Sequence, residues 1–148
     1  ATNWKACYPG LAWATTRELL TKCGGIYDRV ITGGGDNAWA IGVLGDFPRH
    51  LANRWSDLLC EDIRQWAAGL TPHVRSVGYI ESNGVHLYHG NLNNRQYAKR
   101  NEMFREVSFD PQRHLEYAPN GTIRWSQEAP AEFKEFVRAY IHGRKEDE

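Results

Sequence analysis

The sequence of 148 residues lacks the features that mark several large classes of protein. No apolar run reaches the roughly 18 residues that a membrane-spanning helix needs, and no signal peptide is visible, so we expect no transmembrane segment. Basic and acidic side chains are equal in number, which argues against nucleic acid as a partner. Only three cysteines occur, and no two form a Cys-x-x-Cys pair. Their scarcity argues against a disulfide scaffold and favours a reducing, cytoplasmic location.

Internal repeats, low-complexity tracts and linkers are also absent, which predicts a single domain over residues 1–148. Aromatic residues are plentiful at 12%, with six tryptophans, and side chains of this kind either fill a core or stack on sugars and bases. The pattern of apolar residues predicts an α/β (α+β) fold, with a small mixed sheet and packed helices. Predicted helices cover 17–23, 37–44, 51–69, 94–107 and 130–143, and predicted strands cover 11–15, 74–80, 85–88 and two arms of a hairpin within 114–126.

Several polar residues are expected to face solvent without a functional role. On the predicted 51–69 helix they lie opposite the apolar stripe, and His114 lies in a predicted turn. The helical set is Asp57, Glu61, Asp62, Arg64 and Gln65.

A glycine-rich stretch between residues 24 and 45 stands at the centre of the sequence. The run from Gly33 to Gly35 can take positive φ angles and allows close approach to its backbone. Asp36 follows, directly before an apolar segment that predicts a buried helix. Its carboxylate suits either a helix cap or a base at the mouth of a pocket, and the spacing leaves both roles open. Asp28 likewise suits either a turn or a substrate contact.

Two histidines occur in the second strand that the sequence predicts after residue 84. His86 and His89 point to opposite faces of a regular strand, because alternate residues share a face. This weakens a chelate formed by both, and His89, beside Gly90 at the strand end, is the more accessible. We therefore expect a cleft between Gly33–Asp36 and Tyr88–Gly90.

Six short motifs follow one another along the chain. They are Gly10-Leu11-Ala12-Trp13-Ala14, Gly24-Gly25-Ile26-Tyr27-Asp28, Gly33-Gly34-Gly35-Asp36, Leu87-Tyr88-His89-Gly90, Asn94-Arg95-Gln96-Tyr97 and Phe109-Asp110-Pro111. In this order they resemble the acceptor half of GT-A fold glycosyltransferases, most closely the bacterial and phage galactosyltransferase-like proteins. The resemblance extends from about residue 9 to residue 142.

The resemblance implies a role for each matching position. Asp36 would bind the acceptor hydroxyl and, in an inverting enzyme, remove its proton. His89 would bind the divalent metal, Mn²⁺ or Mg²⁺, that holds the diphosphate of the donor. The residues that would shape the sugar and acceptor pocket are Trp13, Gly24, Gly25, Asp28, Gly34 and Gly35. The implied donor is a nucleotide sugar, with UDP-sugars favoured, and the implied acceptor is a glycan or another hydroxyl compound.

One part of the GT-A pattern is missing from the sequence. No Asp-x-Asp occurs, and no βαβ unit precedes Trp13. The resemblance therefore implies a partial domain without its N-terminal nucleotide-binding half. Such a chain would be the C-terminal half of a longer enzyme, or a split relative that needs a separate donor-binding half, or a relative that has lost activity.

Two other functions stay open. A non-catalytic carbohydrate-binding or scaffold domain would use tryptophan and tyrosine stacking without turnover. A metal-dependent phosphodiesterase would combine metal ligands with a basic helix over 95–105 that grips phosphates. The residues of that second alternative are His86, His89, Asn91, Asn93 and Asn94.

Overall fold

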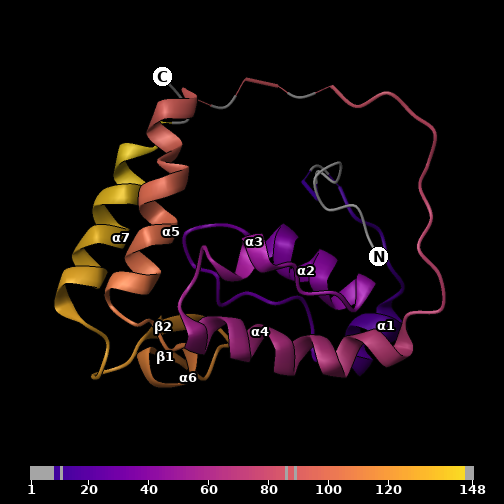
Figure 1. Ribbon diagram of the computed structural model, residues 1–148, viewed down its shortest axis with the longest axis horizontal. Helices are drawn as coiled ribbons and strands as arrows, with labels where there is room; N and C mark the ends of the chain where they lie inside the picture. Colours follow the sequence, from indigo (N-terminus) through magenta and orange to yellow (C-terminus); the bar gives the residue numbers. More distant parts are fainter. Residues whose placement is uncertain (1–8, 11, 86, 89, 146–148) are drawn as a thin grey trace.

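The computed structural model describes residues 9–10, 12–85, 87–88 and 90–145. These residues form an α+β fold of helices and one small sheet (Figure 1). The α-helices are α1 (Arg17–Lys22), α2 (Gly35–Leu44), α3 (Arg49–Ala52), α4 (Asp57–Leu70), α5 (Tyr97–Glu106), α6 (Pro111–His114) and α7 (Ala131–Gly143). Short 3₁₀ helices are η2 (Thr71–His73) and η3 (Leu92–Arg95), and the strands are β1 (Leu115–Tyr117) and β2 (Ile123–Trp125). The predicted α+β class is confirmed, but the described sheet is one antiparallel pair and not mixed.

Helix α1 begins at Arg17, as the sequence predicts, and ends at Lys22, one residue before the predicted end. The Thr16 hydroxyl accepts a hydrogen bond from the Leu19 amide at 3.2 Å, which caps the first turn. Gly24 follows the helix with a φ of 73°, a left-handed conformation that glycine adopts without strain. The strand predicted for 11–15 is wrong over 12–15, because no strand of the described chain lies alongside to pair with these residues.

The single helix predicted over 51–69 is divided into α3 and α4. Ser56 separates them: its backbone is extended, and its hydroxyl accepts from the Leu59 amide at 3.2 Å. The same hydroxyl donates to the Phe109 carbonyl, so Ser56 also ties the start of α4 to the C-terminal part of the chain. The apolar stripe continues across this break, since Leu51 and Trp55 are buried with Leu59, and the periodicity alone therefore hides the break.

Helix α2 lies along α4 at close range (Figure 1). Gly42 is the residue that permits this, because a Cβ there would lie 2.6 Å from the Trp66 ring and 2.7 Å from Leu70. Ala38, Trp39, Ala40 and Ile41 of α2 are buried at or near this interface. The buried helix predicted after Asp36 is thus confirmed.

The C-terminal elements pack around three aromatic rings. These rings belong to Phe104 of α5, to Phe133 of α7 and to Phe109, which lies between α5 and α6. All three are fully buried, with ring centroids 5.1 to 5.4 Å apart. The predicted hairpin is confirmed, with Gly121 at a φ of 80° in its turn. The helix predicted over 94–107 is interrupted at Gln96, whose φ of 43° separates η3 from α5. In Figure 1 α5 and α7 stand side by side, with the hairpin and α6 below them.

The hairpin predicted for 74–88 is wrong for the described residues of that range. Residues 74–85 and 87–88 form no strand, and residues 74–85 pass around the outside of the molecule (Figure 1). Apolar side chains in it remain exposed, at 90% for Tyr79, 82% for Ile80 and 85% for Val85. An isolated two-stranded hairpin has marginal stability in water unless it packs on another surface, and no other described element covers residues 74–85.

None of the helices in the described part of the chain has the length and apolar character that crossing a bilayer requires.

Candidate functional site

The glycine loop places Asp36 at the start of α2. Gly33 and Gly34 have φ angles of 106° and 113°, in the region that favours glycine. Gly34 is the N-cap and Asp36 lies in the first turn, so Asp36 is not the cap itself. Its Oδ1 accepts from the amide and side-chain nitrogens of Asn37, at 2.9 and 3.1 Å. Its Oδ2 faces Gly10, whose Cβ position would lie 3.6 Å away.

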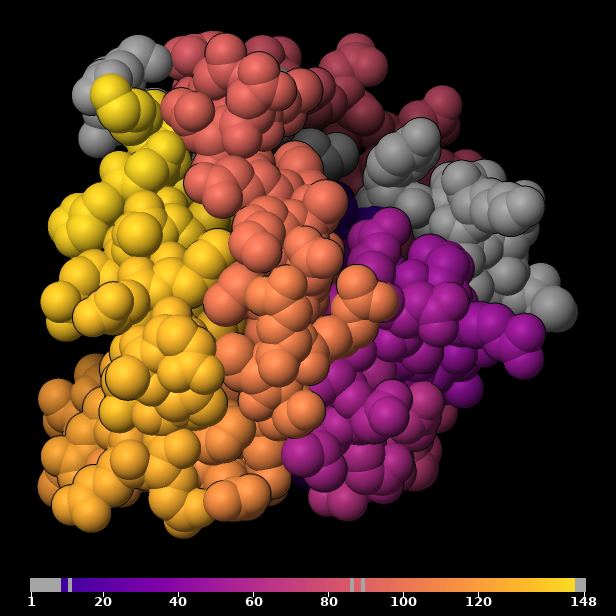
Figure 2. Space-filling view, turned by 60° about the vertical axis from the view of Figure 1, so that its left-hand side comes forward, coloured from indigo at the N-terminus to yellow at the C-terminus, as the bar shows by residue number. Residues whose placement is uncertain are grey.

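Asp36 opens onto a cleft of about 500 Å³. One wall is the glycine loop with Asp36 and Asn37, a second is residues 53–55 after α3, and a third is α5, which contributes Tyr97 and Arg100. Figure 2 shows the border where the surface of α5 meets that of the purple and magenta segments from the N-terminal half of the chain. Amide, carboxylate, guanidinium and aromatic side chains thus converge on one concave surface, and convergent polar groups in a concave pocket mark a candidate binding site.

The second side of this cleft differs from the one that the sequence predicts. Neither Tyr88 nor Gly90 is among the described residues that line it, and α5 occupies that side instead. The reason is that residues 74–85 run outside the molecule and do not fold back as a hairpin. His89, the predicted metal ligand, lies outside the described residues, so its relation to Asp36 stays a prediction.

Arg100 joins the glycine loop to the C-terminal helices. A Cβ on Gly33 would lie 3.0 Å from Arg100 Nη1 and 3.3 Å from its Cζ, so the guanidinium packs directly on the glycine backbone. The same Nη1 donates to the Tyr140 hydroxyl at 2.8 Å, and Cζ lies 4.5 Å from the centre of the Tyr97 ring. These contacts fix the guanidinium at the cleft wall, within a site that also holds Asp36.

Trp55 forms the floor between the loop and α3. It is 3% exposed, and a Cβ on Gly34 would lie 3.3 Å from its ring. Its indole Nε1 is buried without a hydrogen-bond partner among the described residues. Any larger residue at position 34 would therefore push against a rigid aromatic wall and reshape the cleft.

Four of the predicted pocket residues lie apart from this cleft. Trp13 is 44% exposed, donates from Nε1 to the Pro9 carbonyl at 2.7 Å, and packs edge-on against Trp39. Gly24 and Gly25 form the turn after α1, with open space where a Cβ would be, and Trp66 Nε1 donates to the Gly25 carbonyl at 3.3 Å. Asp28, the fourth, accepts at 2.9 Å from the hydroxyl of a tyrosine in β1. The structure therefore brings Gly34 and Asp36 together at the cleft, with Gly35 behind them against the Tyr27 carbonyl.

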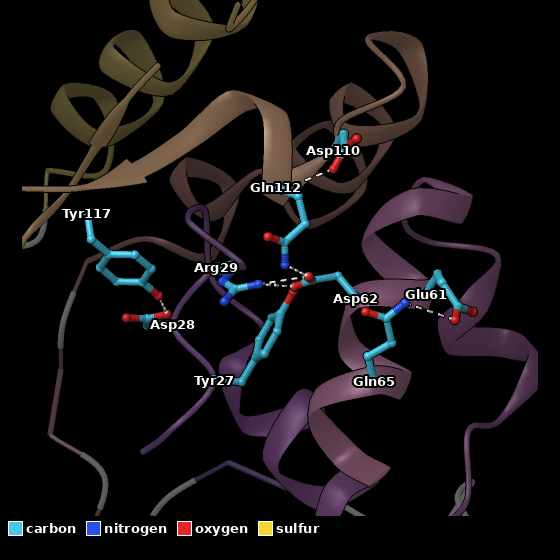
Figure 3. Close-up of polar contacts among 9 residues, drawn as sticks. All are labelled: Tyr27, Asp28, Arg29, Glu61, Asp62, Gln65, Asp110, Gln112 and Tyr117. Carbon is cyan, nitrogen blue, oxygen red and sulfur yellow. Dashed lines mark hydrogen bonds and ion pairs between the residues drawn. The ribbon is translucent and has the colours of Figure 1, made fainter. Parts of the chain in front are cut away.

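Asp62 is a buried carboxylate at the centre of a polar cluster (Figure 3). It is 5% exposed; the Tyr27 hydroxyl donates to Oδ2 at 2.6 Å, and Arg29 Nη1 donates to both oxygens at 2.7 and 2.9 Å. The Gln112 amide also donates to Oδ1. Burial, followed by the hydrogen bond to Asp62, raises the pKa of the Tyr27 phenol above its ordinary range. The expectation that Asp62 faces solvent is wrong, because its partners come from other parts of the chain.

His114 is a second correction of the same kind. It is 6% exposed, and its Nδ1 accepts from the Asp110 amide at 3.1 Å. Burial lowers the pKa of its imidazole. A turn position in the sequence predicts a solvated histidine, but the ring packs against Phe109, at 5.6 Å between centroids.

The metal centre implied by the family resemblance was tested against the described residues. Among them no three His, Cys, Asp or Glu side chains gather closely enough to hold an ion. Asn91, a residue of the phosphodiesterase alternative, accepts from the Asn93 amide at 2.9 Å and caps η3. The described residues by themselves therefore do not fit a metal site.

Comparison with known proteins identifies no relative, since no family model, no curated protein and no solved structure matches the chain.

Proposed function

We propose that this chain is the acceptor-binding part of a glycosyltransferase, which transfers a sugar from a nucleotide-sugar donor to a hydroxyl of a second sugar. The observation that supports it is the position of Asp36. Its carboxylate stands at the edge of a cleft of about 500 Å³, on a glycine loop, with Oδ2 unengaged by any hydrogen bond among the described residues.

The lining of the cleft suits a sugar. Each sugar hydroxyl both donates and accepts, so a sugar site needs donors and acceptors close together. Asn37, Asn53 and Asn101 supply amide groups of both kinds, and Tyr97 supplies an aromatic ring that is half exposed. A neutral apolar pocket would leave such hydroxyls without partners, at a cost of about 1 to 3 kcal/mol each.

In the proposed reaction Asp36 is the base. The free oxygen of its carboxylate accepts the proton of the acceptor hydroxyl, while the oxygen of that hydroxyl forms a bond to the anomeric carbon of the donor. The bond from that carbon to the diphosphate oxygen breaks, the diphosphate leaves with the electron pair, and the proton stays on the carboxylate. A base positioned in this way contributes about 10²- to 10⁴-fold to a rate. The donor-binding half, and a Mn²⁺ or Mg²⁺ bound through His89, remain predictions from the family resemblance.

A carbohydrate-binding domain without turnover is the second candidate, and the same lining favours it. The two proposals differ in what Asp36 does. A binding domain uses the carboxylate only to accept a hydrogen bond, which an isosteric amide replaces in part. A transferase needs its negative charge, which the amide lacks.

The test measures sugar binding and sugar transfer in parallel on Asp36→Asn. Binding is followed by ¹H–¹⁵N NMR titration with a panel of mono- and disaccharides, and transfer by labelled UDP-sugars with Mn²⁺. We expect sugar to shift the cleft residues in both proteins, and transfer to fall by about 10²-fold or more in the variant. Asp57→Asn is the matched control, since Asp57 is also exposed in the first turn of a helix but lies outside the cleft.

Transfer at the wild-type rate by Asp36→Asn would exclude Asp36 as the base. A panel that shifts no cleft residue in either protein would exclude the proposed site. Binding without transfer in the wild-type protein is the result expected of a carbohydrate-binding domain, and equally of an acceptor half that is separated from its donor-binding half.

A further inference from the structure

Positive charge exceeds negative charge in the cleft. Arg54, Arg100 and Arg105 line it, against the carboxylates of Asp36 and Glu102. Glu102 is already engaged outside the cleft by Lys99, with 3.8 Å between Lys99 Nζ and Glu102 Oε2. The chain as a whole carries no net charge, so this local excess of guanidinium groups is a property of the site.

One of the three guanidinium groups is fixed in place. Arg100 is held by the Tyr140 hydroxyl, by the Tyr97 ring and by contact with Gly33. None of these partners is a carboxylate, so no residue of the described chain neutralises its charge by an ion pair. A fixed, uncompensated guanidinium attracts an anion without further ordering of the side chain.

The other two guanidinium groups are exposed and unengaged. The side chains of Arg54 and Arg105 make no hydrogen bond or ion pair among the described residues, whose only hydrogen bonds at these two positions are those of the backbone. Other arginines behave differently: Arg29, Arg113 and Arg124 each pair with a carboxylate at 2.7 to 2.9 Å. Two unengaged guanidinium groups in one cleft with a fixed third are suited to the planar, two-oxygen recognition of a carboxylate or phosphate.

We propose that the cleft selects an acidic acceptor sugar, whose carboxylate or phosphate is bound by Arg54 and Arg105 beside Arg100. This inference rests on the proposed function, since it names the class of acceptor. The neutral hydroxyls of the same sugar lie toward Asn37 and Asp36, and the acidic group lies between residues 53–55 and α5. The three arginines together contribute attraction that a neutral sugar does not receive.

The experiment compares four ligands on the full chain by NMR titration of the cleft amides. These are glucuronate, glucose 6-phosphate, neutral glucose and UDP. The variants are Arg54→Gln and Arg105→Gln, each with a surface side chain that the fold does not use. Arg138→Gln is the matched control, because Arg138 is exposed on α7 and outside the cleft.

We expect an acidic sugar to bind at least about tenfold more tightly than glucose at low salt, and each cleft variant to remove most of that difference. The control variant leaves it unchanged, and raising the salt to about 0.5 M reduces it, because exposed charges are screened. Glucuronate and glucose 6-phosphate, compared with each other, identify carboxylate or phosphate as the preferred group.

Failure of this inference is distinguishable from failure of the proposed function. Glucose that binds as tightly as the acidic sugars overturns the acidic acceptor and leaves the sugar site standing. UDP that shifts the cleft amides in an Arg54-dependent manner, with no shift by acidic sugars, overturns it by assigning the arginines to the donor diphosphate. No shift by any sugar removes both proposals.

Discussion

Replacing Asp62 by alanine is the most informative test of how the fold supports the site. The change removes a carboxylate that accepts from Tyr27, Arg29 and Gln112. The Tyr27 hydroxyl, in a residue only 4% exposed, is left without a partner, at a cost of about 1 to 3 kcal/mol. The Arg29 side chain is 28% exposed and can bind water in place of Asp62, so the loss of this ion pair adds only about 1 kcal/mol. The sum is about 3 kcal/mol of unfolding free energy.

The assay is equilibrium unfolding in urea, followed by tryptophan fluorescence. With a slope of about 2 kcal/mol per molar urea, we expect the midpoint to fall by more than about 1 M at unchanged slope. Glu61→Ala is the control on the preceding residue of α4, where the side chain is 57% exposed and its loss costs less than about 0.5 kcal/mol. A loss below about 1 kcal/mol in Asp62→Ala would refute the argument that this cluster holds the segment before the glycine loop onto α4.

Two further predictions concern the same framework. Burial raises the pKa of Tyr27 in the folded protein, so the phenol loses its proton first in the unfolded chain as the pH rises above about 10. Above that pH this group lowers the free energy of unfolding by about 1.4 kcal/mol per pH unit, and below it the group contributes almost no slope. Urea unfolding between pH 9 and 11 should therefore show a total loss of stability that is smaller by about 1.4 kcal/mol in Tyr27→Phe than in the wild-type protein, and an equal loss would contradict the burial of the phenol. Gly42→Ala places a methyl group against Trp66 and Leu70 and should lower the free energy of unfolding by about 1 to 3 kcal/mol, measured by thermal or urea unfolding. Gly69→Ala, with open space around the new methyl group, should be neutral or stabilising by up to about 1 kcal/mol. Equal effects at the two glycines would mean that α2 and α4 are not in close contact.

Local chemistry made much of the secondary structure predictable. The start of α1 at Thr16, the turn at Gly121 and the start of α7 after Pro130 each depend on one or two residues whose preferences act within a few positions. The break between α3 and α4 was not predicted, because Ser56 interrupts the helix while the apolar periodicity continues across it. The 74–88 hairpin failed for a different reason: alternation of side chains favours a strand only where another strand or a packing surface is present.

Part of the candidate site was predictable because it too depends on residues that are neighbours in the sequence. Asp36 follows three glycines, and a carboxylate after such a loop indicates a functional position without any knowledge of the fold. Arg100 and Asp62 gave no such indication, since Arg100 contacts Gly33 across 67 positions of the sequence and Asp62 contacts Tyr27 across 35. A contact between distant segments is a property of the fold, and a single sequence does not record it.

The outer course of residues 74–85 has a consequence for how the two parts of the chain are joined. This segment contributes no residue to the buried core, so the part before it and the part after it are held together by side chains that cross between them. Ser56 with Phe109, Asp62 with Gln112, and Gly33 with Arg100 are such crossings. The peptide link between the parts acts chiefly by raising their effective concentration for each other. The cleft therefore lies at a junction between two polypeptide segments, in the position that a site between two subunits occupies in an oligomer.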